Sequence, residues 1–131
     1  MFLKNLELQG NNGMKNKNFL SSVKCTISGI LYCIKNERNV KIDIIIAILV
    51  VLLGFVFKLS KIEWCFIVCV IFFVIVSEMF NTAIEKTVDL YTKEYNEIAK
   101  IAKDVSSGAV MLSAICSVIV GCIIFLPKII G

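Results

Sequence analysis

The stretch W-C-F-I-V-C-V-I-F-F-V-I-V, residues 64–76, carries no charge, and S-E-M-F-N-T-A-I-E-K-T-V-D, residues 77–89, follows it directly. A bilayer core needs roughly 20 residues of helix. The uncharged run therefore spans a membrane only if the helix continues through Glu78 and Asn81 to about Ile84. Because a carboxylate near hydrocarbon is energetically costly, we expect this continuation to hold functional residues.

Two other apolar segments, residues 44–57 and 105–126, also lack charge. The chain has 131 residues, of which 58% are hydrophobic, and its mean hydropathy is +0.86, which indicates a membrane protein rather than a soluble domain. The length leaves no room for a separate soluble catalytic domain. We expect an all-α membrane protein whose spans cover about 42–59, 62–84 and 104–126, the second continuing in the cytoplasm to about residue 91.

The N-terminal region is polar and does not have the pattern of a secretory signal peptide. We expect residues 1–17 to form a disordered tail and residues 18–131 to form a single membrane-embedded domain. Apolar residues recur at helical spacing over about 19–36, which predicts an amphipathic helix on the cytoplasmic surface. That set comprises Phe19, Leu20, Val23, Ile27, Ile30, Leu31 and Ile34.

Basic residues predict the orientation of the spans. Of the 14 basic residues, seven precede the first span and four lie between the second and third. Because cytoplasmic loops carry the excess of Lys and Arg, the N-terminus and the second loop should be cytoplasmic and the C-terminus outside.

The polar residues after the second apolar run share one helix face. At 100° per residue, Glu78, Asn81, Glu85 and Asp89 form a narrow stripe, with Glu78 and Glu85 about 10 Å apart along the axis. Two further polar sets map to the same cytoplasmic interface. One is A-K-I-A-K-D-V-S-S-G-A at 99–109, and the other is N-E-R-N at 36–39.

Carboxylates and a lysine at an interface suit Mg²⁺ and a polyphosphate, because magnesium takes oxygen ligands that often bridge to phosphate. The chain has no histidine and no C-x-x-C pair, which argues against a zinc site. A partly desolvated glutamate could accept the proton of a lipid hydroxyl. From spacing alone, catalysis, proton transport and helix pairing all remain open for Glu78.

The segments E-M-F-N-T-A-I-E-K-T-V-D and A-K-I-A-K-D-V-S-S-G-A-V, with N-E-R-N upstream, closely resemble the small prokaryotic diacylglycerol kinase and undecaprenol kinase family. The likeness covers roughly residues 19–128. It implies a homotrimeric helical bundle with active sites shared between protomers at the cytoplasmic interface. It also implies transfer of the γ-phosphate of ATP to a lipid hydroxyl, with Mg²⁺ as cofactor.

The resemblance also implies roles for individual residues. Glu78 would be the catalytic base and would meet the lipid, with Asn81 and Lys103 as further catalytic residues. Glu37 and Glu85 would bind the metal, and Ser107 would lie near the lipid substrate. The implied nucleotide-binding residues are Glu37, Glu85, Asp89, Glu94, Asn96, Lys103 and Asp104.

The E-R-N and I-E-W elements look more like the undecaprenol kinase branch of Gram-positive bacteria, so undecaprenol is the favoured substrate and diacylglycerol the alternative. Many relatives carry histidine where this chain has Asp43 and Asn96. The expected location is the bacterial cell membrane, and no nucleic-acid partner is expected. A small transporter or channel subunit with Glu78 as an ion or proton site is the more distant alternative.

Overall fold

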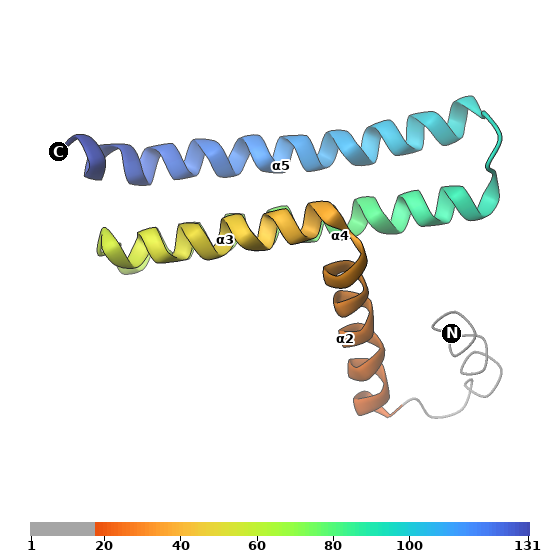
Figure 1. The fold of residues 1–131 in the computed structure, drawn as a ribbon, viewed down its shortest axis with the longest axis horizontal. Coiled ribbons are helices and arrows are strands. Elements are labelled where there is room, and N and C mark those ends of the chain that lie inside the picture. Colours follow the sequence, from red (N-terminus) through yellow and green to blue (C-terminus); the bar gives the residue numbers. More distant parts are fainter. Residues whose placement is uncertain (1–17) are drawn as a thin grey trace. The chain divides into compact units, whose positions relative to one another are not determined.

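The computed structural model describes residues 18–131, and this part of the chain consists of helices joined by short connections, without strands (Figure 1). Its helices are α2 (Phe19–Asn36), α3 (Arg38–Val56), α4 (Lys61–Tyr91) and α5 (Glu97–Ile130). Of these, α3, α4 and α5 are long and apolar enough to cross a membrane. The predicted all-α membrane fold is therefore confirmed. The homotrimer stays a prediction, and the predicted tail over 1–17 lies outside the described residues.

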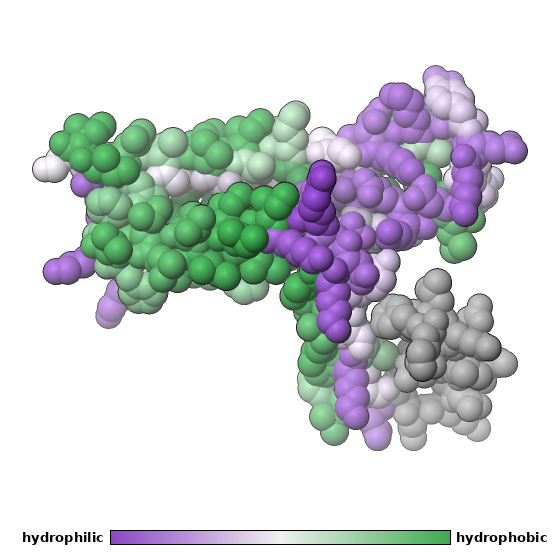
Figure 2. Space-filling view, viewed as in Figure 1, coloured by the Kyte–Doolittle hydropathy of each residue, from purple (hydrophilic) through white to green (hydrophobic). Residues whose placement is uncertain are grey.

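The chain divides into two compact units, one ending at Tyr32 and one covering Cys33–Gly131. In the first unit, α2 exposes its apolar residues, including Phe19, Leu20 and Ile27. Figure 2 shows green, apolar surface along one side of α2 and purple, polar surface along the other, the distribution expected of an amphipathic helix. In the second unit, burial raises the pKa of the Cys33 thiol, with a smaller contribution from the charge of Glu37.

Helix α4 is the centre of the second unit. Both α3 and α5 pack against it, whereas α3 and α5 make no close backbone contact with each other in the described chain. The buried apolar cluster is small and consists of Leu59, Ile67 and Ile124. Most other apolar side chains point outward, as the green surface in Figure 2 shows. This distribution is typical of helices whose outer faces contact lipid.

The turn between α3 and α4 is closed by backbone hydrogen bonds. The N–H of Leu59 donates to the carbonyl of Gly54 (3.1 Å), and the N–H of Lys58 donates to that of Phe55 (3.2 Å), which is the Schellman pattern. Lys58 takes the left-handed conformation that this pattern requires, with φ of 52°. Gly54 faces Trp64 so closely that an added Cβ would lie 2.7 Å from the indole. The two helices are therefore tied at this end.

The start of α4 has a capping box that our sequence analysis did not use. The N–H of Glu63 donates to Oγ of Ser60 (3.3 Å), and the N–H of Ser60 donates to Oε2 of Glu63 (2.7 Å). The S-x-x-E spacing is the usual indication of this motif. Glu63 also pairs with Lys128 at 3.1 Å, which joins the start of α4 to the end of α5.

Helix boundaries differ from the expected spans at two places. Helix α3 begins at Arg38 and ends at Val56, each a few residues before the expected bounds of 42–59. Helix α5 extends beyond 104–126 at both ends, because Asn96 caps it upstream and Pro127 is accommodated in its last turn. The proline ring fixes φ near the helical value, and Pro127 removes one backbone donor from the hydrogen-bond ladder close to the C-terminal end of α5.

Candidate active site

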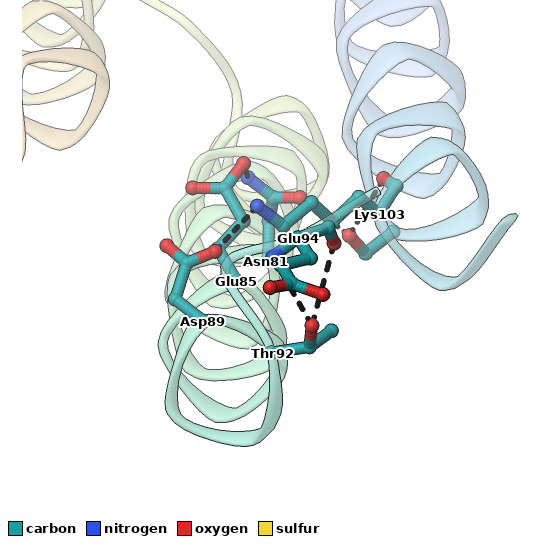
Figure 3. Close-up of polar contacts among 7 residues, drawn as sticks. Asn81, Glu85, Asp89, Thr92, Glu94 and Lys103 are labelled. Carbon is teal, nitrogen blue, oxygen red and sulfur yellow. Dashed lines mark hydrogen bonds and ion pairs between the residues drawn. The ribbon is translucent and has the colours of Figure 1, made fainter. Parts of the chain in front are cut away.

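The polar stripe on α4 is buried at Glu78 and Asn81, half-buried at Glu85 and exposed at Asp89. Glu78 is 6% exposed, Asn81 8% and Thr82 6%. One turn further along, Nδ2 of Asn81 donates to Oε1 of Glu85 at 3.1 Å (Figure 3). Helical spacing explains why these side chains align, since residues four apart are neighbours on one face.

Helix α5 contributes two contacts to this stripe. Oγ of Ser106 donates to Oδ1 of Asn81 at 2.7 Å, and both residues are buried. Nζ of Lys103 lies 2.6 Å from Oδ1 of Asp89, and this ion pair is partly exposed (Figure 3). Because α4 and α5 are antiparallel neighbours joined by a short connection, Lys103 and Ser106 lie next to the polar stripe of α4.

The beginning of α3 supplies the other side of the site. The Asn39 side chain lies within hydrogen-bonding reach of the Glu78 carboxylate, and Asp43, Glu85 and Glu37 are close enough to act on its charge. Oδ2 of Asp43 is buried and has no hydrogen-bond partner within residues 18–131. Glu78 therefore has three other carboxylates nearby, and one of them, that of Asp43, has a buried oxygen without a hydrogen-bond donor in the described residues.

Glu37 stands just before α3 and is the residue that caps it, although its side chain makes no capping hydrogen bond. Its Oε1 lies 3.5 Å from Nζ of Lys86 on α4. Glu37 was predicted to lie at the same interface as the stripe and, from the family resemblance, to bind metal with Glu85; the structure brings it to the helix that carries Glu85.

The remaining predicted residues do not join this network in the described structure. Oδ1 of Asn96 accepts the Ala99 N–H and caps α5, and Asp104 pairs with Lys100 at 2.5 Å. The backbone N–H of Glu94 donates to the Thr92 hydroxyl at 3.2 Å (Figure 3). Ser107 is exposed, while its neighbour Ser106 points to α4. Nucleotide contact by Glu94, Asn96 and Asp104, and lipid contact by Ser107, stay predictions.

Sequence reasoning missed three residues of the site: Ser106, Asn39 and Asp43. Ser106 could have been found, because it follows Lys103 by three positions and therefore shares its helix face. Asn39 belongs to the N-E-R-N set at 36–39, but nothing in the sequence showed that it or Asp43 would approach Glu78. Their approach to Glu78 depends on how α3 packs against α4.

The donor atoms fit a hard divalent cation, which takes oxygen ligands. The unpaired Oδ2 of Asp43 and the carboxylates of Glu37 and Glu85 are such donors. No group of three Asp, Glu or Cys side chains within residues 18–131 forms a ready-made metal site. A cation here would therefore draw further ligands from phosphate oxygens or water, as Mg²⁺ commonly does.

The fold and the site define a class: a small helical membrane protein with a carboxylate-rich polar site at one end of its spans. The sequence profile of prokaryotic diacylglycerol kinase matches residues 24–125. The chain is 44% identical to an undecaprenol kinase of Bacillus subtilis over 100 residues, covering 76% of this chain and 81% of that relative.

Diacylglycerol kinases are also similar to it. The chain is 35% identical to one from Synechocystis over 115 residues, covering 87% of this chain and 66% of the relative. It is 30% identical to one from Escherichia coli over 89 residues, covering 68% and 73%. The chain therefore belongs to the prokaryotic diacylglycerol kinase family.

Family membership confirms the predicted class of enzyme, an ATP-dependent lipid kinase of the membrane. The family and the kinase function were both predicted from the motifs at 78–89 and 99–110. The transporter interpretation of Glu78 is not supported by these relatives.

Proposed function

We propose that this chain phosphorylates undecaprenol, transferring the γ-phosphate of ATP to the lipid hydroxyl with Mg²⁺ as cofactor. The observation that carries the proposal is the position of Glu78. It is 6% exposed, and on α4 it lies between the uncharged run 64–76 and the polar residues Asn81 and Glu85. Only a lipid presents a hydroxyl at that depth, while a nucleotide approaches from the polar side.

Glu78 is the residue proposed to accept the hydroxyl proton as the lipid oxygen attacks the γ-phosphorus. General-base assistance typically contributes about 10²–10⁴-fold to a rate. Asn39, on the α3 side, is proposed to orient the Glu78 carboxylate. The proton would leave the lipid oxygen as its bond to phosphorus forms and the bond to the β-phosphate oxygen breaks.

Glu85 and Glu37 are proposed to hold Mg²⁺, which when bound would neutralise charge on the β- and γ-phosphates. Lys103 is proposed to contact the transferring phosphoryl group. Its ammonium already lies on the same side of α4 as Glu85, where Asp89 holds it. Asp89, Glu94, Asn96 and Asp104 are proposed as further nucleotide contacts, and Ser107 as a lipid contact.

Undecaprenol is proposed over diacylglycerol because the undecaprenol kinase of B. subtilis is 44% identical, against 35% and 30% for the two diacylglycerol kinases described above. Diacylglycerol is the second candidate, since two of these relatives are named diacylglycerol kinases.

We further propose a homotrimer with sites shared between protomers, and a bacterial cell membrane location with the N-terminus cytoplasmic. Alkaline phosphatase fused after Gly131 should then be active outside the membrane.

The test is phosphate transfer from γ-labelled ATP in mixed micelles that contain undecaprenol or diacylglycerol at equal mole fraction. We expect label mainly in undecaprenyl phosphate, dependent on Mg²⁺, and at least about 100-fold less with Glu78→Gln. Glu63→Gln is the matched control, because it removes a glutamate charge at the opposite end of α4 and glutamine still supports a capping box. Preference for diacylglycerol would refute undecaprenol as the proposed substrate. Unchanged activity of the Glu78→Gln variant would refute Glu78 as the general base.

A further inference from the structure

The hydroxyl of Ser106 faces two acceptors at once. Its Oγ lies 2.7 Å from Oδ1 of Asn81 on α4 and 2.9 Å from the backbone carbonyl oxygen of Lys103 on its own helix. A serine hydroxyl has a single hydrogen and two lone pairs. It can therefore donate to only one of these oxygens at a time, and in a site where Ser106 is 5% exposed no bulk water completes the other bond.

Asn81 has a donor on one side of its amide and an acceptor on the other. In the described arrangement Oδ1 faces Ser106 and Nδ2 faces Oε1 of Glu85 at 3.1 Å. Turning the amide by 180° exchanges these roles. Nδ2 would then donate to Oγ of Ser106, whose hydrogen would pass to the Lys103 carbonyl, and Oδ1 would face the Glu85 carboxylate.

The reversed arrangement lets Ser106 accept a hydrogen bond from Nδ2 of Asn81 and donate one to the Lys103 carbonyl, but it sets two oxygens against each other at Glu85. That contact is repulsive unless a cation lies between the oxygens. The orientation with Nδ2 toward Glu85 is therefore the stable one without a cation. The reversed orientation suits a cation-bound Glu85, because an amide oxygen is a good ligand for hard divalent cations.

We propose that Ser106 is a positioning residue that lets the Asn81 amide reverse when a divalent cation binds at Glu85. Asn81 would then supply an oxygen ligand beside the carboxylate. The proposal rests on the proposed function, because it assumes a cation at Glu85. It adds a role for a residue of α5 that does not itself touch the metal or the nucleotide.

The number of hydrogen bonds that Ser106 makes in each state predicts whether its removal strengthens or weakens cation binding. Ser106 makes one hydrogen bond without the cation, and two after reversal, one accepted from Asn81 and one donated to Lys103. Removing the hydroxyl should therefore penalise the cation-bound state by about one extra hydrogen bond. This corresponds to a cation affinity that is about threefold to tenfold weaker.

The experiment measures Mn²⁺ binding to the purified full chain by electron paramagnetic resonance, with a non-hydrolysable ATP analogue present. We expect Ser106→Ala to weaken Mn²⁺ binding by about threefold to tenfold and Ser106→Thr, which keeps the hydroxyl, to bind within about twofold of wild type. Ser113→Ala is the matched control. Ser113 is a fully buried serine on the same helix whose hydroxyl donates only to the carbonyl of Val110.

A second background separates positioning from a general structural effect. With Asn81→Ala in place, no amide is left to orient, so adding Ser106→Ala should not weaken Mn²⁺ binding further. Wild-type Mn²⁺ affinity in Ser106→Ala, an equal loss in Ser113→Ala, or full additivity with Asn81→Ala would each overturn the role of Ser106. Absence of Mn²⁺ binding by the wild-type chain would instead overturn the metal site of the proposed function, and this inference with it.

Discussion

Nζ of Lys103 lies 2.6 Å from Oδ1 of Asp89, so a residue of α5 is held by a residue of α4 across the connection 92–96 (Figure 3). The two side chains are 40% and 53% exposed. An ion pair this exposed is screened by solvent and contributes little to stability. The ion pair matters more for position, because it keeps the Lys103 ammonium beside the face of α4 that carries Glu85.

We expect Asp89→Asn to raise the KM for ATP because Lys103 loses the partner that orients it. The increase should be about threefold to tenfold in the wild-type background and under about twofold in the Lys103→Gln background. The unfolding temperature should stay close to that of the wild type, because solvent screens this exposed ion pair. The measurement is steady-state kinetics of the wild type, the two single variants and the double variant. Independent effects of the two substitutions on KM would contradict the prediction.

Gly54→Ala should destabilise the α3–α4 hairpin. The added Cβ would lie 2.7 Å from Cη2 of Trp64 and 3.1 Å from Cδ1 of Leu59, so neighbouring side chains must move. Overpacking of this kind typically costs about 1–3 kcal/mol. Gly121→Ala is the control, because its added Cβ would meet no described atom within 4 Å apart from its own stretch of helix backbone. In detergent, the unfolding temperature of Gly54→Ala should be well below those of both the wild type and Gly121→Ala.

Lys58→Gly should be more stable than Lys58→Ala by about 1 kcal/mol. Position 58 has φ of 52°, a conformation in which a Cβ is strained and glycine is not. Both substitutions remove the same side-chain charge, so their difference isolates the backbone. Equal unfolding temperatures for the two variants would show that the left-handed turn is not a source of strain.

Ser60→Ala should cost about 1 kcal/mol of stability, because the Glu63 N–H loses its capping acceptor. Ser60→Asn should retain most of that stability, since asparagine is a good capping residue. The KM for ATP should stay at the wild-type value in both variants, because Ser60 and the polar stripe lie at opposite ends of α4. A changed KM would mean that the two ends of the helix are coupled.

The sequence by itself determined the helical membrane fold, the family and the stripe from Glu78 to Asp89. These follow from local quantities: the length of uncharged runs sets the spans, and a period of 3.6 residues aligns side chains on one helix. Only the tertiary structure decided which groups from α3 and α5 meet the stripe. Ser106 reaches Asn81 across 25 positions, and Asn39 approaches Glu78 from α3. Such partners depend on how each helix is rotated against α4, which is set by packing over the whole interface.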